Sequence, residues 1–221
     1  MVVKELSKKR ASIRLLLIIP LIIGICLEFL MFCLYRDTRR IFWVIYLIAQ
    51  IIIWISLGFV LGRLYMATYR DELTDLWNRR YLYIKLDDEM RRVSGDSILS
   101  LAILDVDNFK CINDRKGHLF GDAVLREIAI ILQRNIRQGD VAGRWGGEEF
   151  IIILPNTDKA GAKAVCERIR DTIENYDFGC KITISAGLTS VTRPVTTNKL
   201  IEMADYALYE AKKTKNTIAI Y

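Results

Sequence analysis

Two long apolar runs open the chain, and after residue 62 they give way to a polar sequence with shorter hydrophobic segments. The runs cover residues 13–35 and 41–62, and the short loop 36–40 separates them. Each run has about 20 residues, enough for a helix to cross a bilayer. Neither shows a polar face, which disfavours a buried helical hairpin. The pattern predicts two transmembrane helices joined by a tight turn.

A secretory signal peptide is the alternative for the first run. It is disfavoured because the run is too long and no small-residue cleavage site follows it. The basic segment 1–12 favours a cytoplasmic N-terminus, whereas three arginines in the loop 36–40 oppose that orientation. Glu28 and Gln50 are polar positions inside the runs. They are expected to face a partner helix, with a protonated Glu28 near the lipid edge as the alternative.

The polar part of the chain predicts a helical stalk over residues 63–71 and one domain over residues 72–221. The domain has about 150 residues, an ordinary domain size. Its apolar periodicity predicts the following elements in order: a helix at 78–93, a strand at 97–106, a helix at 120–137, strands at 140–145 and 148–155, a helix at 159–176, a strand at 180–191, a helix at 197–213 and a strand at 217–221. The central β-α-β-β-α-β order is typical of a ferredoxin-like or palm-type α+β fold. We expect its helices to cover one face of the sheet.

Charge and cysteine usage exclude two classes of function. Residues 1–62 carry eight Lys or Arg and three Asp or Glu, whereas residues 63–221 carry 24 and 23. The basic excess therefore lies outside the domain, which argues against a nucleic acid polymer as partner. The five cysteines form no CxxC pair and only one histidine is present, so a zinc site is not expected.

Acidic residues mark two neighbouring points of the predicted sheet. Asp105 and Asp107 end the strand 97–106, and the tip 146–149 of the following hairpin reads Gly-Gly-Glu-Glu. If the first strand lies beside the third, Asp105 faces this tip. Clustered carboxylates repel one another unless a cation joins them, and oxygen ligands suit Mg²⁺. The glycines would let a nucleotide approach the backbone closely.

Five ordered motifs resemble those of the GGDEF domain, the catalytic domain of diguanylate cyclases. They are DELTDLWNRR at 71–80, DVDNFKCINDRKGHLFGD at 105–122, GGEEF at 146–150, ITISAGLTS at 182–190 and ADYALYEAKK at 204–213. The resemblance implies the GGDEF fold after the two-helix hairpin. It also implies that two GTP molecules are condensed into cyclic di-GMP with release of two pyrophosphates. Each domain would supply half of the site, so a homodimer is implied.

The resemblance also implies roles for single residues. Asp105, Glu148 and the Val106 carbonyl would hold two Mg²⁺ ions per GTP site, with Mn²⁺ as a substitute. Asp105, Glu148 and Glu149 would be catalytic, Glu149 by metal binding or by activating the 3′-hydroxyl. The implied substrate-binding residues are Phe109, Lys110, Asn113, His118, Asp122, Gly146, Gly147, Lys212 and Lys215.

Among these, Asn113 and Asp122 would bind the guanine edge. His118 is alternatively a turn histidine without a direct role. Lys212 and Lys215 are alternatives for the phosphate contact, because the last helix of this chain departs from the family pattern by one residue and a missing glycine.

Arg137 and Asp140 form an RxxD motif five residues before GGEEF. It resembles the inhibitory site that binds cyclic di-GMP in this family, with an ordinary solvated ion pair as the alternative. The interpretation as a whole is a multi-pass enzyme of the bacterial cytoplasmic (inner) membrane, in contact with lipid and with its catalytic domain in the cytoplasm. A catalytically silent cyclic di-GMP receptor and a membrane adaptor are the alternatives.

Overall fold

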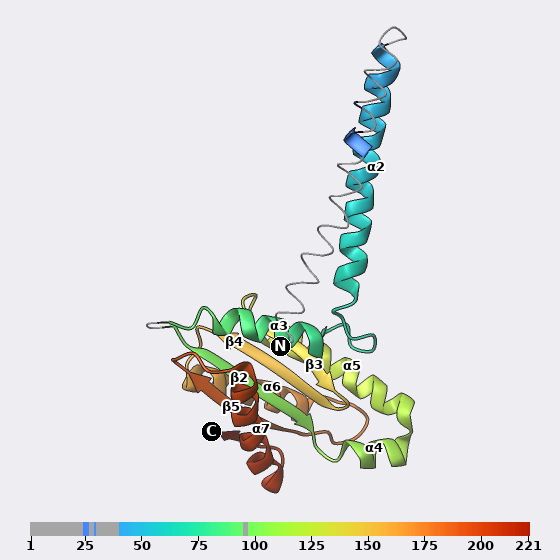
Figure 1. Ribbon diagram of the computed structural model, residues 1–221. Helices are drawn as coiled ribbons and strands as arrows, with labels where there is room; N and C mark the ends of the chain where they lie inside the picture. Colours follow the sequence, from blue (N-terminus) through green and yellow to red (C-terminus); the bar gives the residue numbers. More distant parts are fainter. Residues whose placement is uncertain (1–23, 27–28, 30–39, 95–96) are drawn as a thin grey trace. The chain divides into compact units, whose positions relative to one another are not determined.

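The computed structural model describes residues 24–26, 29, 40–94 and 97–221 (Figure 1). The chain divides into two compact units, residues 1–68 and residues 69–221, each of which is described by itself. The predicted N-terminal segment, most of the first apolar run and nearly all of the loop that follows it lie outside the described residues, as does Glu28.

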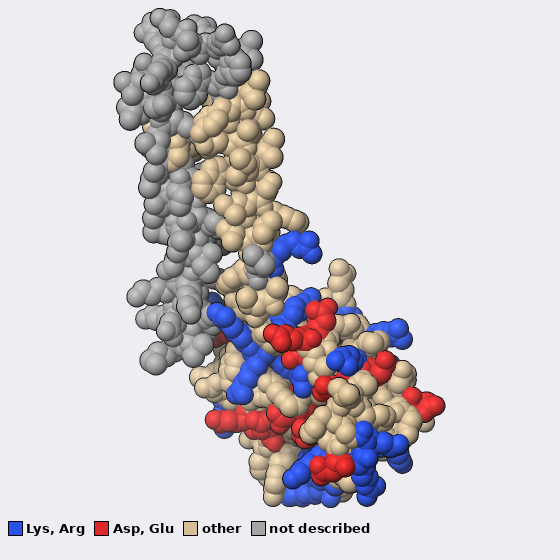
Figure 2. All heavy atoms as spheres, turned by 90° about the vertical axis from the view of Figure 1, so that its right-hand side faces the viewer, with Lys and Arg blue, Asp and Glu red and all other residues tan. Residues whose placement is uncertain are grey.

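Helix α2, Arg40–Ala67, contains the second apolar run. Its segment Val44–Ala67 is long and apolar enough to cross a membrane, by length and composition only. Figure 2 shows this helix as tan, free of Lys, Arg, Asp and Glu over most of its length. The predicted helix at 41–62 is therefore confirmed as a helix. It continues beyond residue 62 but ends at Ala67, short of the predicted end of the stalk at residue 71.

Gln50 finds its hydrogen-bond partners within its own helix. Its Nε2 donates to the Tyr46 hydroxyl over 3.0 Å, and its Oε1 accepts from Trp54 Nε1 over 3.4 Å. These residues stand four positions apart, so they lie along one side of α2. The expectation that Gln50 faces a partner helix stays a prediction, because most of the first apolar run lies outside the described residues.

The second unit is built on a six-stranded sheet with the order β1-β3-β4-β2-β5-β6. Strand β2 runs antiparallel to both of its neighbours, whereas the edge strands β1 and β6 join in parallel. The strands are β1 Trp77–Asn78, β2 Leu99–Val106, β3 Val141–Gly146, β4 Glu149–Pro155, β5 Ile184–Val191 and β6 Ile218–Ile220. The predicted adjacency of the first and third strands is confirmed as β2 beside β4. The two-residue strand β1 was not predicted.

Five helices complete this unit: α3 Arg79–Met90, α4 Phe109–Lys116, α5 His118–Asn135, α6 Lys159–Asn175 and α7 Thr197–Thr214. All but the short helix α4 were predicted from periodicity. Three of the longer helices begin at polar caps, where the side chains of Asn78, Asp158 and Thr196 accept backbone N–H groups of the first turn. Such caps satisfy donors that the helix itself leaves unpaired.

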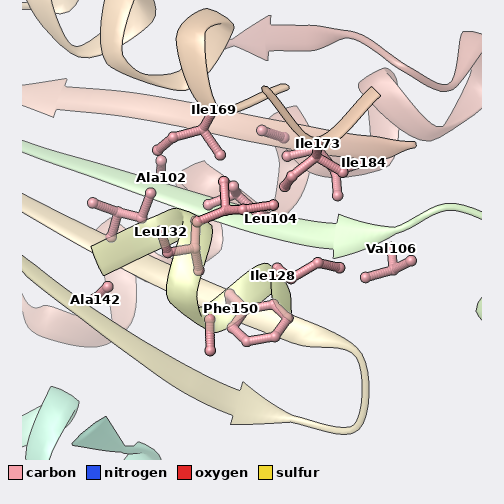
Figure 3. Packing of buried hydrophobic residues seen from close by; sticks show 14 of the residues in the cluster. Ala102, Leu104, Val106, Ile128, Leu132, Ala142, Phe150, Ile169, Ile173 and Ile184 are labelled. Carbon is pink, nitrogen blue, oxygen red and sulfur yellow. The ribbon is translucent and has the colours of Figure 1, made fainter. Parts of the chain in front are cut away.

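Helices cover both faces of the sheet, so the predicted one-sided arrangement is wrong. Figure 3 shows Ile128 and Leu132 of α5 and Ile169 of α6 packed with Ala102 and Leu104 of β2. A second cluster packs α3 and α7 against the opposite face, through Leu82, Leu86, Leu200 and Leu208 together with Leu101 and Ile103 of β2. Successive residues of a strand point to opposite faces. Because β2 is apolar at nearly every position, each face requires its own cover.

Helix α7 packs very closely on β5 at Gly187. A Cβ atom at this position would lie 2.1 Å from the Leu208 backbone nitrogen and 2.2 Å from the Ala204 carbonyl oxygen. The contact fixes the height of α7 over the sheet. Lys212 lies one helical turn beyond Leu208 and is therefore held near the end of the central strands.

Candidate active site

The tip of the β3–β4 hairpin lies beside the end of β2. The antiparallel register pairs Leu104 with Phe150 and Asp105 with Glu149. Glu149, rather than Glu148, is thus directly opposite Asp105. The Glu148 carbonyl accepts from the Val106 N–H over 3.4 Å, which joins the tip to β2. Phe150, which follows Glu149, is buried in the core and anchors the β4 side of the tip (Figure 3).

Both glycines of the tip leave open space around the backbone. A Cβ atom at Gly146 or Gly147 would meet no other atom within 4 Å. Gly147 also adopts a positive φ of 54°, a conformation that side chains with a Cβ rarely take. Backbone groups at this turn are therefore accessible to a ligand.

Arg144 holds the hairpin tip to the beginning of the domain. Its Nε and Nη2 donate to the Gly147 carbonyl over 2.9 and 2.7 Å, and its Nη1 donates to Asp71 Oδ1 over 3.1 Å. The Asp71 carboxylate also accepts from the N–H and hydroxyl of Thr74. Burial acts to raise the pKa of Asp71, but the bonds from Thr74 and Arg144 outweigh it and lower the pKa. The sequence pattern did not reveal this structural role of Arg144.

The two lysines that the sequence left as alternatives reach different oxygens. Lys212 forms an ion pair with Asp105, and its Nζ also lies 3.4 Å from both the Val106 carbonyl oxygen and Asp107 Oδ1. Lys215 Nζ instead donates to Asn108 Oδ1 over 2.6 Å. Lys212 is therefore the lysine that joins the acidic cluster.

The two aspartates at the end of β2 have different environments. Asp107 is only 3% exposed and accepts hydrogen bonds from the hydroxyls of Thr183 and Ser185 and from the Asn216 backbone N–H, over 2.7–2.9 Å. Burial alone would raise the pKa of Asp107, but these bonds lower it. Asp107 therefore ties three segments together and is fully engaged in doing so. Asp105 faces the hairpin instead.

The carboxylates of Asp105 and Glu149 have raised pKa values, partly because neighbouring carboxylates repel their negative charge. Burial is the largest cause that raises the pKa of Asp105, and the charges of Glu148 and Asp107 add to it against the opposing effect of Lys212. Burial also raises the pKa of Glu149, with further contributions from Asp105, Asp205 and Glu148. Asp205 was not predicted as part of this cluster. Such a group of carboxylates attracts cations.

Divalent metal ions fit the donor set at the end of β2. No group of three or more His, Cys, Asp and Glu side chains is placed to hold a metal within the part of the chain that the structure describes. Mg²⁺ does not require such a cage, because it usually takes one or two carboxylates together with water and substrate phosphates. The Lys212 ammonium, itself a cation, already lies on the Asp105 carboxylate and the Val106 carbonyl. The same oxygens would suit Mg²⁺.

Helix α4 begins directly after the acidic cluster. Asn108 precedes it in a left-handed conformation, with φ at 57°, and makes no side-chain cap to the helix. The N–H groups of the first turn, which begins at Phe109 and Lys110, therefore have no cap from Asn108. Uncapped N–H groups at a helix N-terminus are suited to binding phosphate.

Asn113 and Gly121 are in close contact between α4 and α5. The Asn113 Oδ1 atom is buried and has no hydrogen-bond partner among the described residues. A Cβ atom at Gly121 would lie only 1.9 Å from it, so glycine is needed there to leave room for the amide. Asp122 follows Gly121 and is partly buried, whereas His118 is exposed at the start of α5. A buried acceptor without a partner is costly, and a ligand donor would remove that cost.

Arg137 and Asp140 lie at the other end of β3 from the hairpin tip. Arg137 Nε donates to Asp140 Oδ1 over 3.0 Å, and its Nη2 donates to the carbonyl of Pro155 and the hydroxyl of Thr157. A cavity of about 580 Å³ adjoins Asp140 and is lined also by Tyr81, Lys85, Glu89, Arg92 and Gln138. This size is ordinary for a small-molecule site. Asp140 of the RxxD pair thus borders a cavity whose lining includes none of the residues of the acidic cluster.

Comparisons with known proteins identify the family of the domain. Residues 68–217 match the family model for the diguanylate cyclase GGDEF domain. The chain is 43% identical over 149 residues to diguanylate cyclase DgcP of Pseudomonas aeruginosa. The aligned region covers 65% of this chain but only 22% of the length of DgcP. Among solved structures, it resembles the coiled coil and GGDEF domain of DgcB from Caulobacter crescentus in complex with c-di-GMP, with a TM-score of 0.74, 28% identity and coverage of 80% of this chain and 97% of that one. It also resembles the active GGEEF domain of a diguanylate cyclase from Vibrio cholerae, with a TM-score of 0.61, 35% identity and coverage of 66% and 97%.

Replacing Arg144 by methionine is expected to loosen the hairpin tip. The change removes the bonds to Gly147 and Asp71 and should lower the free energy of unfolding by about 1–3 kcal/mol at pH 7. Because folding lowers the pKa of Asp71, the contribution of its charge is complete above about pH 3.8 and is lost as the pH falls below that value. The difference from wild type should be constant between pH 7 and pH 5 and shrink below pH 3.8.

Urea unfolding of the full chain in detergent, followed by tryptophan fluorescence, measures this difference. Arg91→Met is the matched control, since the side chain of Arg91 is 62% exposed and pairs with the surface carboxylates of Asp87 and Asp88. It should cost well under 1 kcal/mol. Equal losses for the two variants would contradict the role given to Arg144.

Proposed function

The chain belongs to the GGDEF family, and we propose that it is a diguanylate cyclase, which condenses two GTP molecules into cyclic di-GMP with release of two pyrophosphates. The observation that carries this proposal is the position of Asp105 opposite the glycine-rich hairpin tip and beside Lys212. Carboxylates, accessible backbone and an ammonium group are together suited to metal-assisted chemistry on phosphates.

In the proposed site, Asp105, Glu148 and the Val106 carbonyl would hold Mg²⁺. When bound, Mg²⁺ neutralises charge on the phosphates and aligns the reacting groups. The first N–H groups of α4, at Phe109 and Lys110, would donate hydrogen bonds to the phosphate oxygens. Glu149, whose pKa is raised by burial and by its acidic neighbours, is suited to receiving a proton from the attacking 3′-hydroxyl.

Guanine recognition is assigned to Asn113 and Asp122. Guanine presents adjacent N–H donors on its Watson–Crick edge, and the buried Asn113 oxygen and the Asp122 carboxylate are acceptors. Adenine carries an acceptor at the corresponding ring nitrogen, so it would leave these groups unpaired. Sites built on such hydrogen bonds discriminate strongly against analogues that lack them.

The reaction joins two GTP molecules, each held by one domain, so we assign the active form to a homodimer. The 3′-oxygen of one GTP attacks the α-phosphate of the other, and the open space around Gly146 and Gly147 allows a second domain to approach. Helix α2 is assigned to a membrane because its apolar surface is exposed along its length. Crosslinking in membranes and resistance to alkaline carbonate washing test the two assignments, and monomers in active membranes would contradict the first.

Purified full-length protein is expected to convert GTP and Mg²⁺ into cyclic di-GMP, separated and quantified by chromatography. Glu148→Gln keeps the size of the side chain but removes the charge of a metal ligand, so the rate should fall at least ~100-fold. Glu210→Gln is the control, because Glu210 pairs with Lys213 on the exposed side of α7. A dimeric wild-type sample that binds cyclic di-GMP but never forms it would instead support the silent receptor.

Gly121→Ala is expected to weaken GTP binding without unfolding the protein. The added Cβ atom would displace the Asn113 amide, a flexible side chain that can move, from its place in the guanine site. Loss of one such hydrogen bond should raise the KM for GTP about tenfold and reduce the preference for GTP over ATP. Steady-state kinetics with both nucleotides checks this, and Gly62→Ala in α2, where a Cβ atom meets nothing within 4 Å, is the control. An unchanged KM would remove Asn113 from the guanine site.

The product is proposed to inhibit the enzyme by binding at Arg137 and Asp140. The support is the cavity beside Asp140 and the exposed guanidinium of Arg137, whose Nη1 group takes no part in the three hydrogen bonds described above and can donate to a phosphate or a guanine. Arg137→Lys keeps the charge but loses this geometry. Initial rates should match wild type, whereas the concentration of cyclic di-GMP for half inhibition should rise at least ~10-fold. Identical inhibition curves would show that the product acts elsewhere.

A further inference from the structure

We propose that Lys212 is an internal counter-cation of the acidic site: its ammonium group occupies the metal-binding oxygens in the nucleotide-free protein and leaves them when metal and triphosphate bind together. This inference rests on the proposed function, because it takes the metal ligands from there. It adds a role that precedes any contact of Lys212 with phosphate.

The contacts of one nitrogen atom carry the inference. Lys212 Nζ pairs with Asp105 and lies 3.4 Å from the Val106 carbonyl oxygen and from Asp107 Oδ1. Two of these three oxygens belong to the proposed metal ligands. Mg²⁺ binds its oxygen ligands at about 2.0–2.1 Å, so it cannot share them with an ammonium at the same place. Metal binding must therefore move Lys212.

The surroundings make such an exchange feasible. The backbone of α7 is fixed by its close packing on Gly187, whereas the side chain of Lys212 is 28% exposed. A lysine has a flexible stem, so its ammonium can turn from Asp105 to a phosphate while the helix stays in place. The neighbouring lysines are engaged elsewhere, Lys213 with Glu210 and Lys215 with Asn108.

The exchange has a consequence for the order of binding. Asp105, Glu148 and Glu149 are close enough to influence one another's charge, and Lys212 compensates part of it. A metal ion alone must displace this lysine and leave it without a partner. A metal ion that arrives with a triphosphate supplies the lysine with new oxygens. Metal and nucleotide binding are therefore coupled through Lys212.

The test measures metal binding without nucleotide or turnover. Full-length protein in detergent is titrated with Mn²⁺, and free Mn²⁺ is followed by electron paramagnetic resonance. Lys212→Met should bind Mn²⁺ roughly tenfold or more tightly than wild type, since a competing positive charge at the site is gone. Lys213→Met removes the same charge one residue away and should match wild type. Adding Asp105→Asn to Lys212→Met should abolish the gain.

Thermal unfolding gives a second measurement. In the absence of divalent ions, Lys212→Met should have a lower melting temperature than wild type. Added Mn²⁺ should raise the melting temperature of Lys212→Met more than that of Lys213→Met. Equal Mn²⁺ affinities of the Lys212 and Lys213 variants would overturn the inference, whether or not the enzyme is active. An inactive wild type together with a gain in Lys212→Met would overturn the cyclase assignment and leave the inference standing.

Discussion

Strand β2 has to bury both of its faces, and much of the domain is arranged around that requirement. Its apolar side chains alternate between a cluster under α5 and α6 and a cluster under α3 and α7. Strands β4 and β5 satisfy its backbone on either side. A charged side chain is tolerated on β2 only where the covering helices end, which is at Asp105. The acidic site is therefore located at the point where a fully enclosed strand leaves the core.

The same location explains the electrostatics of the site. Carboxylates at the end of a buried strand are partly removed from water, which disfavours their charge. Asp107 overcomes this with hydrogen bonds from Thr183, Ser185 and Asn216 and becomes part of the framework. Asp105 has no such set of donors and relies on the ammonium of Lys212. Asp107 is thus part of the framework, whereas Asp105 faces the hairpin tip and pairs with a cation.

Strand β3 relates the two proposed sites of the domain. The hairpin tip lies at one end, where Arg144 holds the Gly147 carbonyl, and the Arg137–Asp140 pair lies just before the other end. Six residues of extended chain separate Asp140 from Gly146, roughly 20 Å. The two sites are therefore too far apart for direct contact between their ligands, so any feedback has to act through the position of a whole domain or of this strand.

Much of this was already determined by the sequence. Apolar periodicity located most helices and strands, and the spacing of short motifs identified the family, because both depend on residues near one another in the chain. The tertiary structure alone decided which faces of the sheet are covered, that Glu149 rather than Glu148 lies opposite Asp105, that Asp107 is engaged in the framework, and that Lys212 rather than Lys215 reaches the acidic cluster. Arg144, more than 70 residues from Asp71, belongs with these. Each depends on strand register or on contacts between distant segments, which local pattern does not encode.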